Sequence, residues 1–249
     1  MTLAKELLLQ LRWGVWLKRP GLRFYCERLK RNEPFSFSRF GDGEWFAILG
    51  KSGANCDGHA YYPELGQDLR TCLSSPQSYL YGLQPFALKK AGAAVRDYIR
   101  TNRIRLDWHY SDVFHTCNKD GAFFPMIEQL RAKKVVMVGP AHLRPIEKAV
   151  FPWYDFVEVP PSDCYRHTAA IERGMLAAAE KHGPVVFAIS ASMAAKVMIH
   201  HLYPTLGATC WLLDFGAVWD IYAGVQSRSI YRKIDWAPII RKNLGGVRA

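Results

Sequence analysis

The segment Phe35-Ser36-Phe37-Ser38-Arg39-Phe40-Gly41-Asp42-Gly43-Glu44-Trp45 is the part of the chain from which a fold can be predicted first. Its first residues alternate between apolar and polar, which indicates a short strand. Two glycines then flank Asp42, and Glu44 precedes an apolar run, residues 45–49, that suits a helix. A strand that ends in a glycine-rich turn before a helix is a common place for an anionic ligand.

The two carboxylates of this turn favour a divalent cation, since a bare phosphate would be repelled. A cation between Asp42, Glu44 and a diphosphate cancels charge on both sides. Arg39 would add a planar fork for a phosphate oxygen. The alternative is an exposed turn whose acidic residues complement the helix dipole.

The rest of the chain alternates apolar, strand-like segments with amphipathic, helix-like ones. Strands are predicted at residues 79–83, 105–110, 134–138, 155–159, 185–189 and 208–213. One helix is predicted to begin at residue 63, and two more to span residues 87–101 and 166–181. This alternation is typical of an α/β protein with a Rossmann-like, mainly parallel sheet and helices on both faces. Ligands of such sheets bind beyond the carboxyl ends of the strands.

Small or polar residues follow several predicted strands. Gly139, Ser190, Ser192 and Asp214 stand at such ends, as Asp42 and Glu44 do. Small residues after the strand at 185–189 would let the next helix begin close to a ligand, with its free amides facing the crevice. Loops lie at these ends in any doubly wound fold, so position alone does not prove a site.

The motif Ser-Arg-Phe-Gly-Asp-Gly-Glu resembles the Asp-x-Glu signature of the GT-D-type glycosyltransferases, a bacterial and phage family first described as a domain of unknown function. Leu213-Asp214-Phe215-Gly216 resembles a second family motif, and the similarity extends over roughly residues 34–232. The resemblance implies a Rossmann-like fold, a sugar-nucleotide donor and a divalent metal. A histidine follows the second motif in the family, whereas Ala217 stands there in this chain, so the resemblance assigns neither a further metal ligand nor the base.

The function that we expect on these grounds is metal-dependent glycosyl transfer from a nucleoside diphosphate sugar, with a UDP-sugar as the expected donor, to an acceptor hydroxyl with inversion. Asp42 and Glu44 would hold Mn²⁺ or Mg²⁺, which stabilises the leaving diphosphate. The residues expected at the donor are Arg39, Gly41, Gly139, Ser190, Ser192 and Arg228. The candidate bases, in order, are Asp214, Asp220 and His109. A glycan, a glycoprotein, a lipid-linked sugar or modified DNA would serve as acceptor.

The net charge of +11 suits a polyanionic partner. It leaves open an alternative function, a nucleic-acid-binding or nucleic-acid-modifying protein that uses its basic surface. The sequence contains no Gly-x-Gly-x-x-Gly turn, no Gly-Lys-Ser/Thr loop and no Gly-x-Ser-x-Gly elbow, which weighs against a dehydrogenase, a P-loop NTPase and an esterase. No apolar run is long enough for a transmembrane helix. Six scattered cysteines favour reduced thiols and a cytoplasmic protein, with peripheral membrane attachment as an addition to that prediction.

The predicted domain organisation is an N-terminal helical extension, residues 1–31, followed by one α/β domain, residues 32–249, with a basic C-terminal tail. Within the extension Leu3, Leu7, Leu8, Leu11 and Val15 form an apolar stripe, and a break is expected at Pro20-Gly21. We expect this helix to pack on the domain and on a second subunit, which would make a homo-oligomer. The alternative is a helix that lies on a membrane interface.

Overall fold

The computed structural model describes residues 2–246, and in this part of the chain seven strands form one sheet whose neighbouring strands are all parallel. The strands are β1 (Phe37–Phe40), β2 (Leu80–Leu83), β3 (Trp108–Tyr110), β4 (Val135–Gly139), β5 (Asp155–Glu158), β6 (Val186–Ile189) and β7 (Trp211–Asp214). Their order across the sheet is β3-β2-β1-β7-β6-β4-β5. The predicted α/β, Rossmann-like fold is confirmed, and each predicted strand is present with shifted ends.

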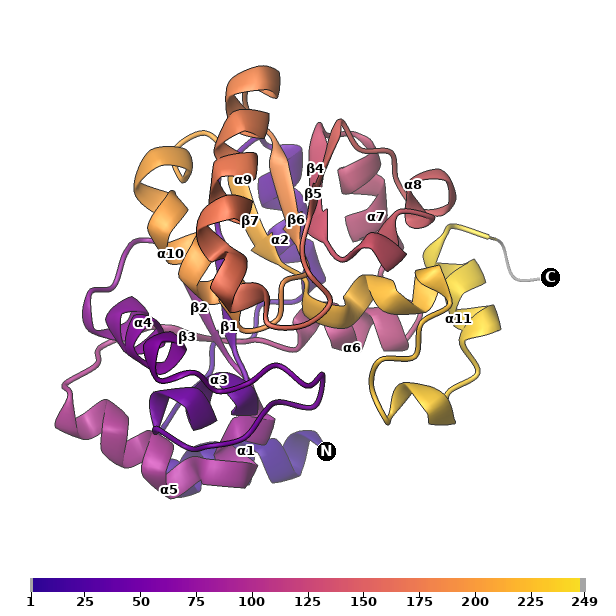
Figure 1. Cartoon of the computed structure of the whole chain (residues 1–249). Helices are drawn as coiled ribbons and strands as arrows, with labels where there is room; N and C mark the ends of the chain where they lie inside the picture. Colours follow the sequence, from indigo (N-terminus) through magenta and orange to yellow (C-terminus); the bar gives the residue numbers. More distant parts are fainter. Residues whose placement is uncertain (1, 247–249) are drawn as a thin grey trace.

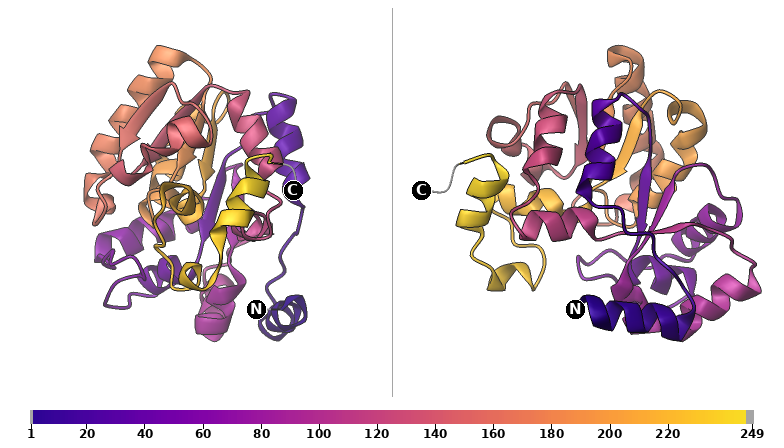
Figure 2. Two further views of the ribbon diagram at one scale, coloured as in Figure 1. Left: turned by 90° about the vertical axis from the view of Figure 1, so that its right-hand side faces the viewer. Right: turned by 180° about the vertical axis from the view of Figure 1, so that it is seen from behind.

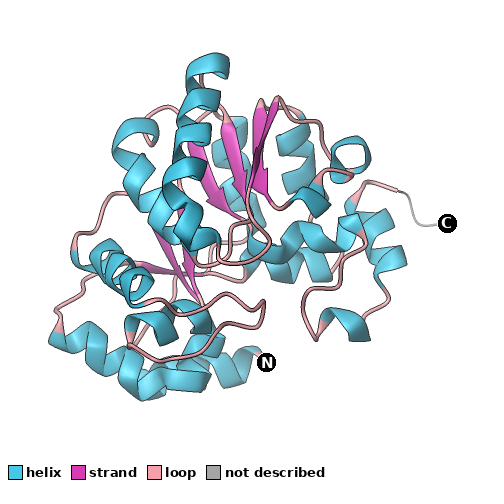
Figure 3. Ribbon diagram, in the orientation of Figure 1, coloured by secondary structure: helices cyan, strands magenta, loops and turns pink. Residues whose placement is uncertain are grey.

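Helices cover both faces of this sheet (Figures 1 and 3). One face carries α3 (Asp42–Ile48), α4 (Pro63–Ser74), α5 (Pro85–Thr101), α9 (Thr168–His182) and α10 (Ala194–Leu206). The other carries α2 (Leu22–Lys30), α6 (Val113–Lys119), α7 (Phe124–Arg131), α8 (Ile146–Ala149) and the 3-10 helix η3 (Gly216–Ala223). The remaining elements are α1 (Leu3–Trp13), α11 (Trp236–Asn243) and the 3-10 helices η1 (Ala141–Leu143), η2 (Cys164–His167) and η4 (Tyr231–Lys233).

The central strands are apolar because both of their faces are covered. Every residue of β4 and β6 is buried, so their sequences read as continuous hydrophobic runs and not as alternating ones. β1 is also buried throughout, although it contains Ser38 and Arg39. A buried arginine in a central strand needs partners, and these partners belong to the candidate site described below.

The chain changes faces at the contact between β1 and β7. After β1 it continues into α3 on one face of the sheet, whereas after β7 it continues into η3 on the opposite face. The two connections therefore leave the sheet in opposite directions at neighbouring strands. This is a topological switch point, which is the place where open α/β sheets bind their ligands.

The N-terminal segment differs from the prediction in where its helix ends. α1 ends at Gly14, whose left-handed backbone (φ 63°) closes the helix six residues before Pro20. The chain then runs beside β3, where the Lys18 N–H donates to the Trp108 carbonyl at 2.7 Å and the Tyr110 N–H donates to the Lys18 carbonyl at 2.8 Å. The N-terminal segment thus extends the edge of the sheet. The proposed division into two parts at residue 31 stays a prediction.

The helix α1 packs on the domain with the face that the sequence did not indicate. Leu9 and Trp13 contact the core, and Glu6 and Gln10 are buried. Gly92 of α5 allows this contact, because a Cβ there would lie 2.2 Å from the Trp13 Nε1. The leucine stripe, which we define as Leu3, Leu7, Leu8 and Leu11, faces solvent instead, with each side chain between 45% and 65% exposed. The helix packs on the domain as expected, and Val15 of the predicted stripe is buried, but the four leucines of that stripe do not pack on the domain.

Candidate active site

Arg39 of β1 and Asp214 of β7 meet at the switch point. The Arg39 Nη2 lies 3.2 Å from the Asp214 Oδ1, and both side chains are buried. Gly216 makes room for this pair, since a Cβ there would lie 2.2 Å from the Arg39 Nη2. Its φ of +55° also suits glycine, and its N–H donates to the Asp214 Oδ1 at 3.0 Å. The second sequence motif thus serves to position the arginine of the first.

Lys196, in the first turn of α10, reaches the same site from the end of β6. Its ammonium lies 2.9 Å from the Glu44 Oε1 and 2.9 Å from the Asp214 Oδ2, and it donates to the Ser192 carbonyl at 3.0 Å. Three acceptors match the three protons of an ammonium group. Burial lowers the pKa of Lys196, but Asp214 and Glu44 more than offset this, so that its pKa is raised. The lysine is therefore a permanent cation inside the site.

Each carboxylate oxygen of Asp214 lies close to a cation, Oδ1 to Arg39 and Oδ2 to Lys196. Burial raises its pKa, whereas Arg39 and Lys196 lower it by more, so the pKa of Asp214 lies below its ordinary value. The side chain is fully buried. Its geometry is that of a residue that positions Arg39 and Lys196, and its predicted role as the base has no support in these contacts.

Glu44 is likewise engaged at both carboxylate oxygens. Its Oε2 accepts the Gly41 N–H at 2.7 Å, as a glutamate at the third position of a helix commonly does, and its Oε1 faces Lys196. Arg39, Lys196, Glu44 and Asp214 together carry two positive and two negative charges, so the buried cluster is neutral as it stands.

Asp42 differs from Glu44 because it keeps one oxygen without a protein partner. Its Oδ1 accepts the Gly43 N–H at 3.1 Å, and the side chain is half-buried. Burial and the charge of Glu44 raise the pKa of Asp42, against a smaller lowering by Lys90. Asp42 is therefore the carboxylate of the motif with an oxygen left for a further ligand.

The residues present fit a divalent ion that binds Asp42. They do not fit an ion that also binds Glu44 directly, because Lys196 pairs with the Glu44 carboxylate. Within residues 2–246 no group of three or more His, Cys, Asp or Glu side chains is arranged around a common point. Magnesium is often held by one or two carboxylates, water and the phosphates of a substrate, so a single protein carboxylate is sufficient for that kind of site. The assignment of Glu44 as a metal ligand stays a prediction.

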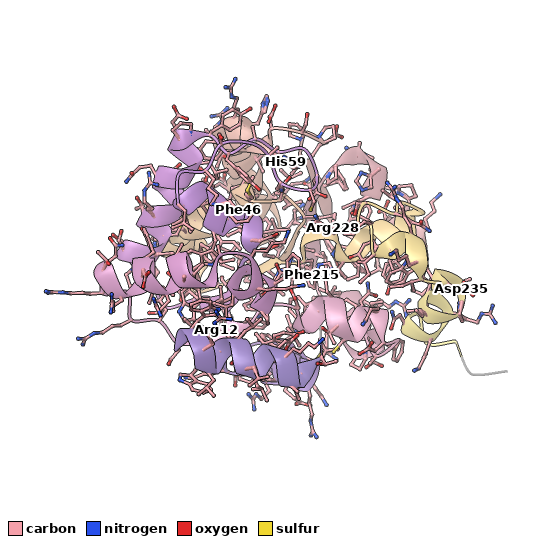
Figure 4. The ribbon with its side chains drawn as sticks, turned by 90° about the horizontal axis from the view of Figure 1, so that it is seen from below. Arg12, Phe46, His59, Phe215, Arg228 and Asp235 are labelled. Atoms are coloured by element: carbon pink, nitrogen blue, oxygen red, sulfur yellow. The ribbon has the colours of Figure 1, made fainter. Side chains whose placement is uncertain are left out.

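The C-terminal segment reaches across the site through Arg228. Its Nη1 lies 2.9 Å from the Asp57 Oδ2 and also contacts the Cys56 Sγ. Figure 4 shows Arg228 next to the loop that carries His59. Burial lowers the pKa of Arg228, but Asp57 and Cys56 raise it by more. Two loops far apart in sequence, residues 50–62 and 224–230, are thus joined over the switch point.

His115 of α6 lies beside Arg39 on the other side of the site. Burial, Arg39 and Arg228 keep the pKa of His115 well below 6.5, so the imidazole is neutral at pH 7. The Tyr231 hydroxyl lies 2.9 Å from its Nδ1 and donates to the Ala217 carbonyl at 3.4 Å. In the tautomer that satisfies both contacts, Nδ1 carries the proton and Nε2 has a free lone pair. The Nε2 lies 3.7 Å from the point that a Cβ on Gly216 would occupy.

The remaining predicted residues lie in three places. Gly139, Ser190 and Ser192 are at the ends of β4 and β6, where the Ser190 Oγ is buried without a partner and Ser192 accepts a hydrogen bond from Asn55. Asp220 is held by His142 and Ser227. His109 lies apart from the site, between Tyr25 and Phe24, where burial lowers its pKa. The structure therefore does not bring His109 to the residues that are expected to bind the sugar nucleotide.

Two residues at the centre of the site, Lys196 and His115, were not among the predicted site residues. In the sequence Lys196 only interrupts an apolar run. A charged lysine that is buried needs acidic partners, but the sequence does not show which residues these are. His115 follows the predicted strand at 105–110 by five residues, but the short helix that carries it was not predicted. Its link to Tyr231 joins residues that are far apart in the chain, and no local pattern predicts such a contact.

Gly216 gives a first testable prediction. The substitution Gly216→Ala should destabilise the fold by about 1–3 kcal/mol, since it forces a side chain into a left-handed backbone and against Arg39. Urea denaturation measures this, with Gly14→Ala as a matched control whose backbone is also left-handed (φ 63°) but whose Cβ would meet nothing within 4 Å. Equal losses in the two variants would show that contact with Arg39 is not what requires glycine at residue 216.

The similarity of this chain to known proteins lies in its fold. No family model and no curated protein matches the sequence. Among solved structures, one described as a new glycosyltransferase (DUF1792) from Streptococcus sanguinis matches with a TM-score of 0.62 at 17% identity, over 83% of this chain and 84% of that chain. The chain shares the fold of this structure. A structure described as showing that the highly conserved domain of unknown function 1792 has a distinct glycosyltransferase fold matches with a TM-score of 0.61 at 18% identity, over 87% of this chain and 84% of that chain.

A selenomethionine-substituted structure of domain of unknown function 1792 matches equally well, with a TM-score of 0.62 at 18% identity over 87% of this chain and 84% of that chain. The DUF1792 fold confirms the architecture that the Asp-x-Glu resemblance implied. At this level of identity the likeness concerns the fold, so the activity has to be argued from the site.

Proposed function

We propose that this protein is a glycosyltransferase that moves a sugar from a nucleoside diphosphate sugar to an acceptor hydroxyl. The observation that carries the proposal is the pairing of Arg39 with Asp214 at a topological switch point, with Asp42 in the turn that follows the strand of Arg39, in a chain that shares the fold of structures described as glycosyltransferases. An arginine at such a point suits a diphosphate. The expected donor is a UDP-sugar, as the resemblance of the sequence motif implies.

Arg39 and Arg228 are the groups that would bind the diphosphate. The Arg39 Nε is buried without a partner, so it has a donor left after its contact with Asp214. Arg228 is held by Asp57 and Cys56 from the opposite loop. The unpartnered Ser190 hydroxyl lies at the end of β6, close to the first turn of α10. These donors would hold the negative charge that develops on the leaving diphosphate.

In this proposal Asp42 would bind the divalent ion. When bound there with the phosphates of the donor, Mg²⁺ or Mn²⁺ would act as a Lewis acid that stabilises the departing diphosphate. Lys196 keeps Glu44 and Asp214 neutralised, so Asp42 is the carboxylate of the motif that is free to serve this ion.

His115 is the base that the geometry supports best. Its Nε2 is unprotonated at neutral pH and faces the region next to Arg39, where an acceptor hydroxyl would meet the anomeric carbon. An anionic donor between Arg39 and Arg228 would cancel the two charges that depress the pKa of His115, which strengthens the base when the donor is present. Direct attack by the acceptor would invert the anomeric centre.

Nucleic acid, the alternative partner, gains no support from the N-terminal basic residues. Of these, Arg19, Arg23, Arg31 and Lys18 each lie within 3.7 Å of an acidic side chain. Such pairs reduce the positive charge that attracts phosphates.

Donor hydrolysis by the purified protein tests the proposal. We expect hydrolysis of at least one member of a panel of nucleoside diphosphate sugars, with UDP-sugars tried first. Arg228→Ala should weaken donor binding, whereas the matched control Arg144→Ala, which removes an exposed arginine paired with Glu158, should not. A protein that binds no nucleotide sugar in calorimetry and hydrolyses none would contradict the proposal.

The metal gives a second prediction. Asp42→Asn should abolish the stimulation of donor hydrolysis by Mn²⁺ while the thermal midpoint stays close to that of the wild type, because Asp42 holds no other side chain. Glu44→Gln should lower the midpoint, because Glu44 holds Lys196 and the Gly41 amide. Full donor hydrolysis in excess chelator would contradict any metal at this site.

A further inference from the structure

The helix α1 presents an apolar surface that the rest of the described chain leaves uncovered. The leucine stripe (Leu3, Leu7, Leu8 and Leu11) runs along its outer side, and Trp16, just after the helix, is 62% exposed. Figure 2 shows α1 at the margin of the molecule beside α5, and Figure 4 shows it along one edge. Isolated exposed leucines are ordinary, but four on one face of one helix mark an interaction surface.

The orientation of α1 is inverted relative to an ordinary surface helix. Its polar residues Glu6 and Gln10 point inward, where Glu6 pairs with Arg19 at 2.7 Å and the Gln10 Oε1 accepts the Leu17 N–H at 3.1 Å. These contacts fix the helix with its leucines outward. The polar contacts of Glu6 and Gln10 therefore keep the leucine stripe exposed.

The charge around the leucine stripe indicates what covers it. Lys5 and Arg12 are exposed on α1, and Lys89 and Lys90 are exposed on the neighbouring α5. The single acidic residue of α1, Glu6, is buried against Arg19. Leucine and tryptophan bordered by lysine and arginine are the composition of a helix that lies in the interface of an anionic membrane.

We propose that α1 binds the surface of an anionic lipid bilayer, with the leucine stripe and Trp16 in the boundary between headgroups and acyl chains. A second copy of the chain fits this surface less well, because it would bring the same exposed cations and a net charge of +11 toward an identical face. No described helix is long and apolar enough to cross a bilayer, so attachment would be peripheral. This inference stands independently of the proposed glycosyl transfer.

Co-flotation of the full chain with vesicles tests the inference. The protein should float with vesicles of equimolar phosphatidylcholine and phosphatidylglycerol, float less with pure phosphatidylcholine, and bind less as salt rises. Leu8→Glu/Leu11→Glu should lower the partition coefficient by about 100-fold or more, since each leucine that no longer enters the bilayer costs about tenfold or more. Leu176→Glu on α9, another exposed leucine, should bind as the wild type does.

Two further measurements separate the outcomes. Circular dichroism and donor hydrolysis should be unchanged in Leu8→Glu/Leu11→Glu, because both side chains are exposed and neither belongs to the candidate site. Sedimentation equilibrium should give a monomer for the wild type. A wild-type dimer that this double variant dissociates, or a wild-type protein that does not float with anionic vesicles, would overturn the inference.

Discussion

Replacement of His115 by glutamine is expected to slow acceptor-dependent transfer by about 10²–10⁴-fold, the usual contribution of a positioned general base. The physical reason is the free lone pair on Nε2, which the contacts of Tyr231 and the low pKa of His115 maintain. Donor hydrolysis by water should change less than transfer does. Steady-state kinetics with saturating donor and varied acceptor measures the difference.

The pH dependence of acceptor transfer also tests the role of His115. Burial, Arg39 and Arg228 hold the pKa of His115 well below 6.5 before the donor binds, and a bound anionic donor would raise it from there. With saturating donor, kcat/KM for the acceptor should therefore fall at acid pH, where His115 becomes protonated, and should not depend on this group at higher pH. This acid limb should disappear in His115→Gln. His201→Gln, an exposed histidine that pairs with Glu172, is the control and should behave as the wild type. Unchanged transfer in His115→Gln would contradict the role of His115 as the base.

Replacement of Lys196 by methionine is expected to lower the free energy of unfolding by about 3–5 kcal/mol. The change would leave Glu44 and Asp214 buried with only Arg39 to balance two negative charges, and the loss of one partner from a buried ion cluster has this magnitude. Urea denaturation followed by circular dichroism measures it. Lys196→Met/Glu44→Gln should recover part of the loss, because the second change removes one unbalanced charge.

Lys181→Met is the matched control for this measurement. Lys181 pairs with Asp155 at 3.3 Å, but its side chain is 66% exposed, so its loss should cost no more than about 1 kcal/mol. If Lys196→Met were as stable as Lys181→Met, the buried cluster would not be held together by the lysine.

The sequence predicts the sheet of this protein well because its strands are buried on both faces. Continuous apolar runs such as Val135–Gly139 and Val186–Ile189 permit few other structures, and the turn after Phe40 marks the end of β1. The gathering of the predicted site residues at strand ends follows from the same logic, because parallel strands bring their carboxyl ends to one edge.

The rest of the site could not be predicted because it depends on contacts between distant residues. Lys196 reaches two carboxylates, one of which lies 152 positions earlier in the chain, and only the packing of α10 on the sheet brings them together. The leucine stripe of α1 has the period of a buried face, yet polar contacts at Glu6 and Gln10 turn it outward. Periodicity identifies an apolar face but does not tell whether the domain or another surface covers it.

The position of a bound nucleoside diphosphate tests the central claim most directly. A crystal structure of the protein with UDP and Mn²⁺ should show the diphosphate in contact with Arg39 at the ends of β1 and β7, with Mn²⁺ on Asp42 and with His115 beyond the terminal phosphate. A diphosphate bound away from this edge of the sheet, with Arg39 still paired only with Asp214, would contradict the proposed site.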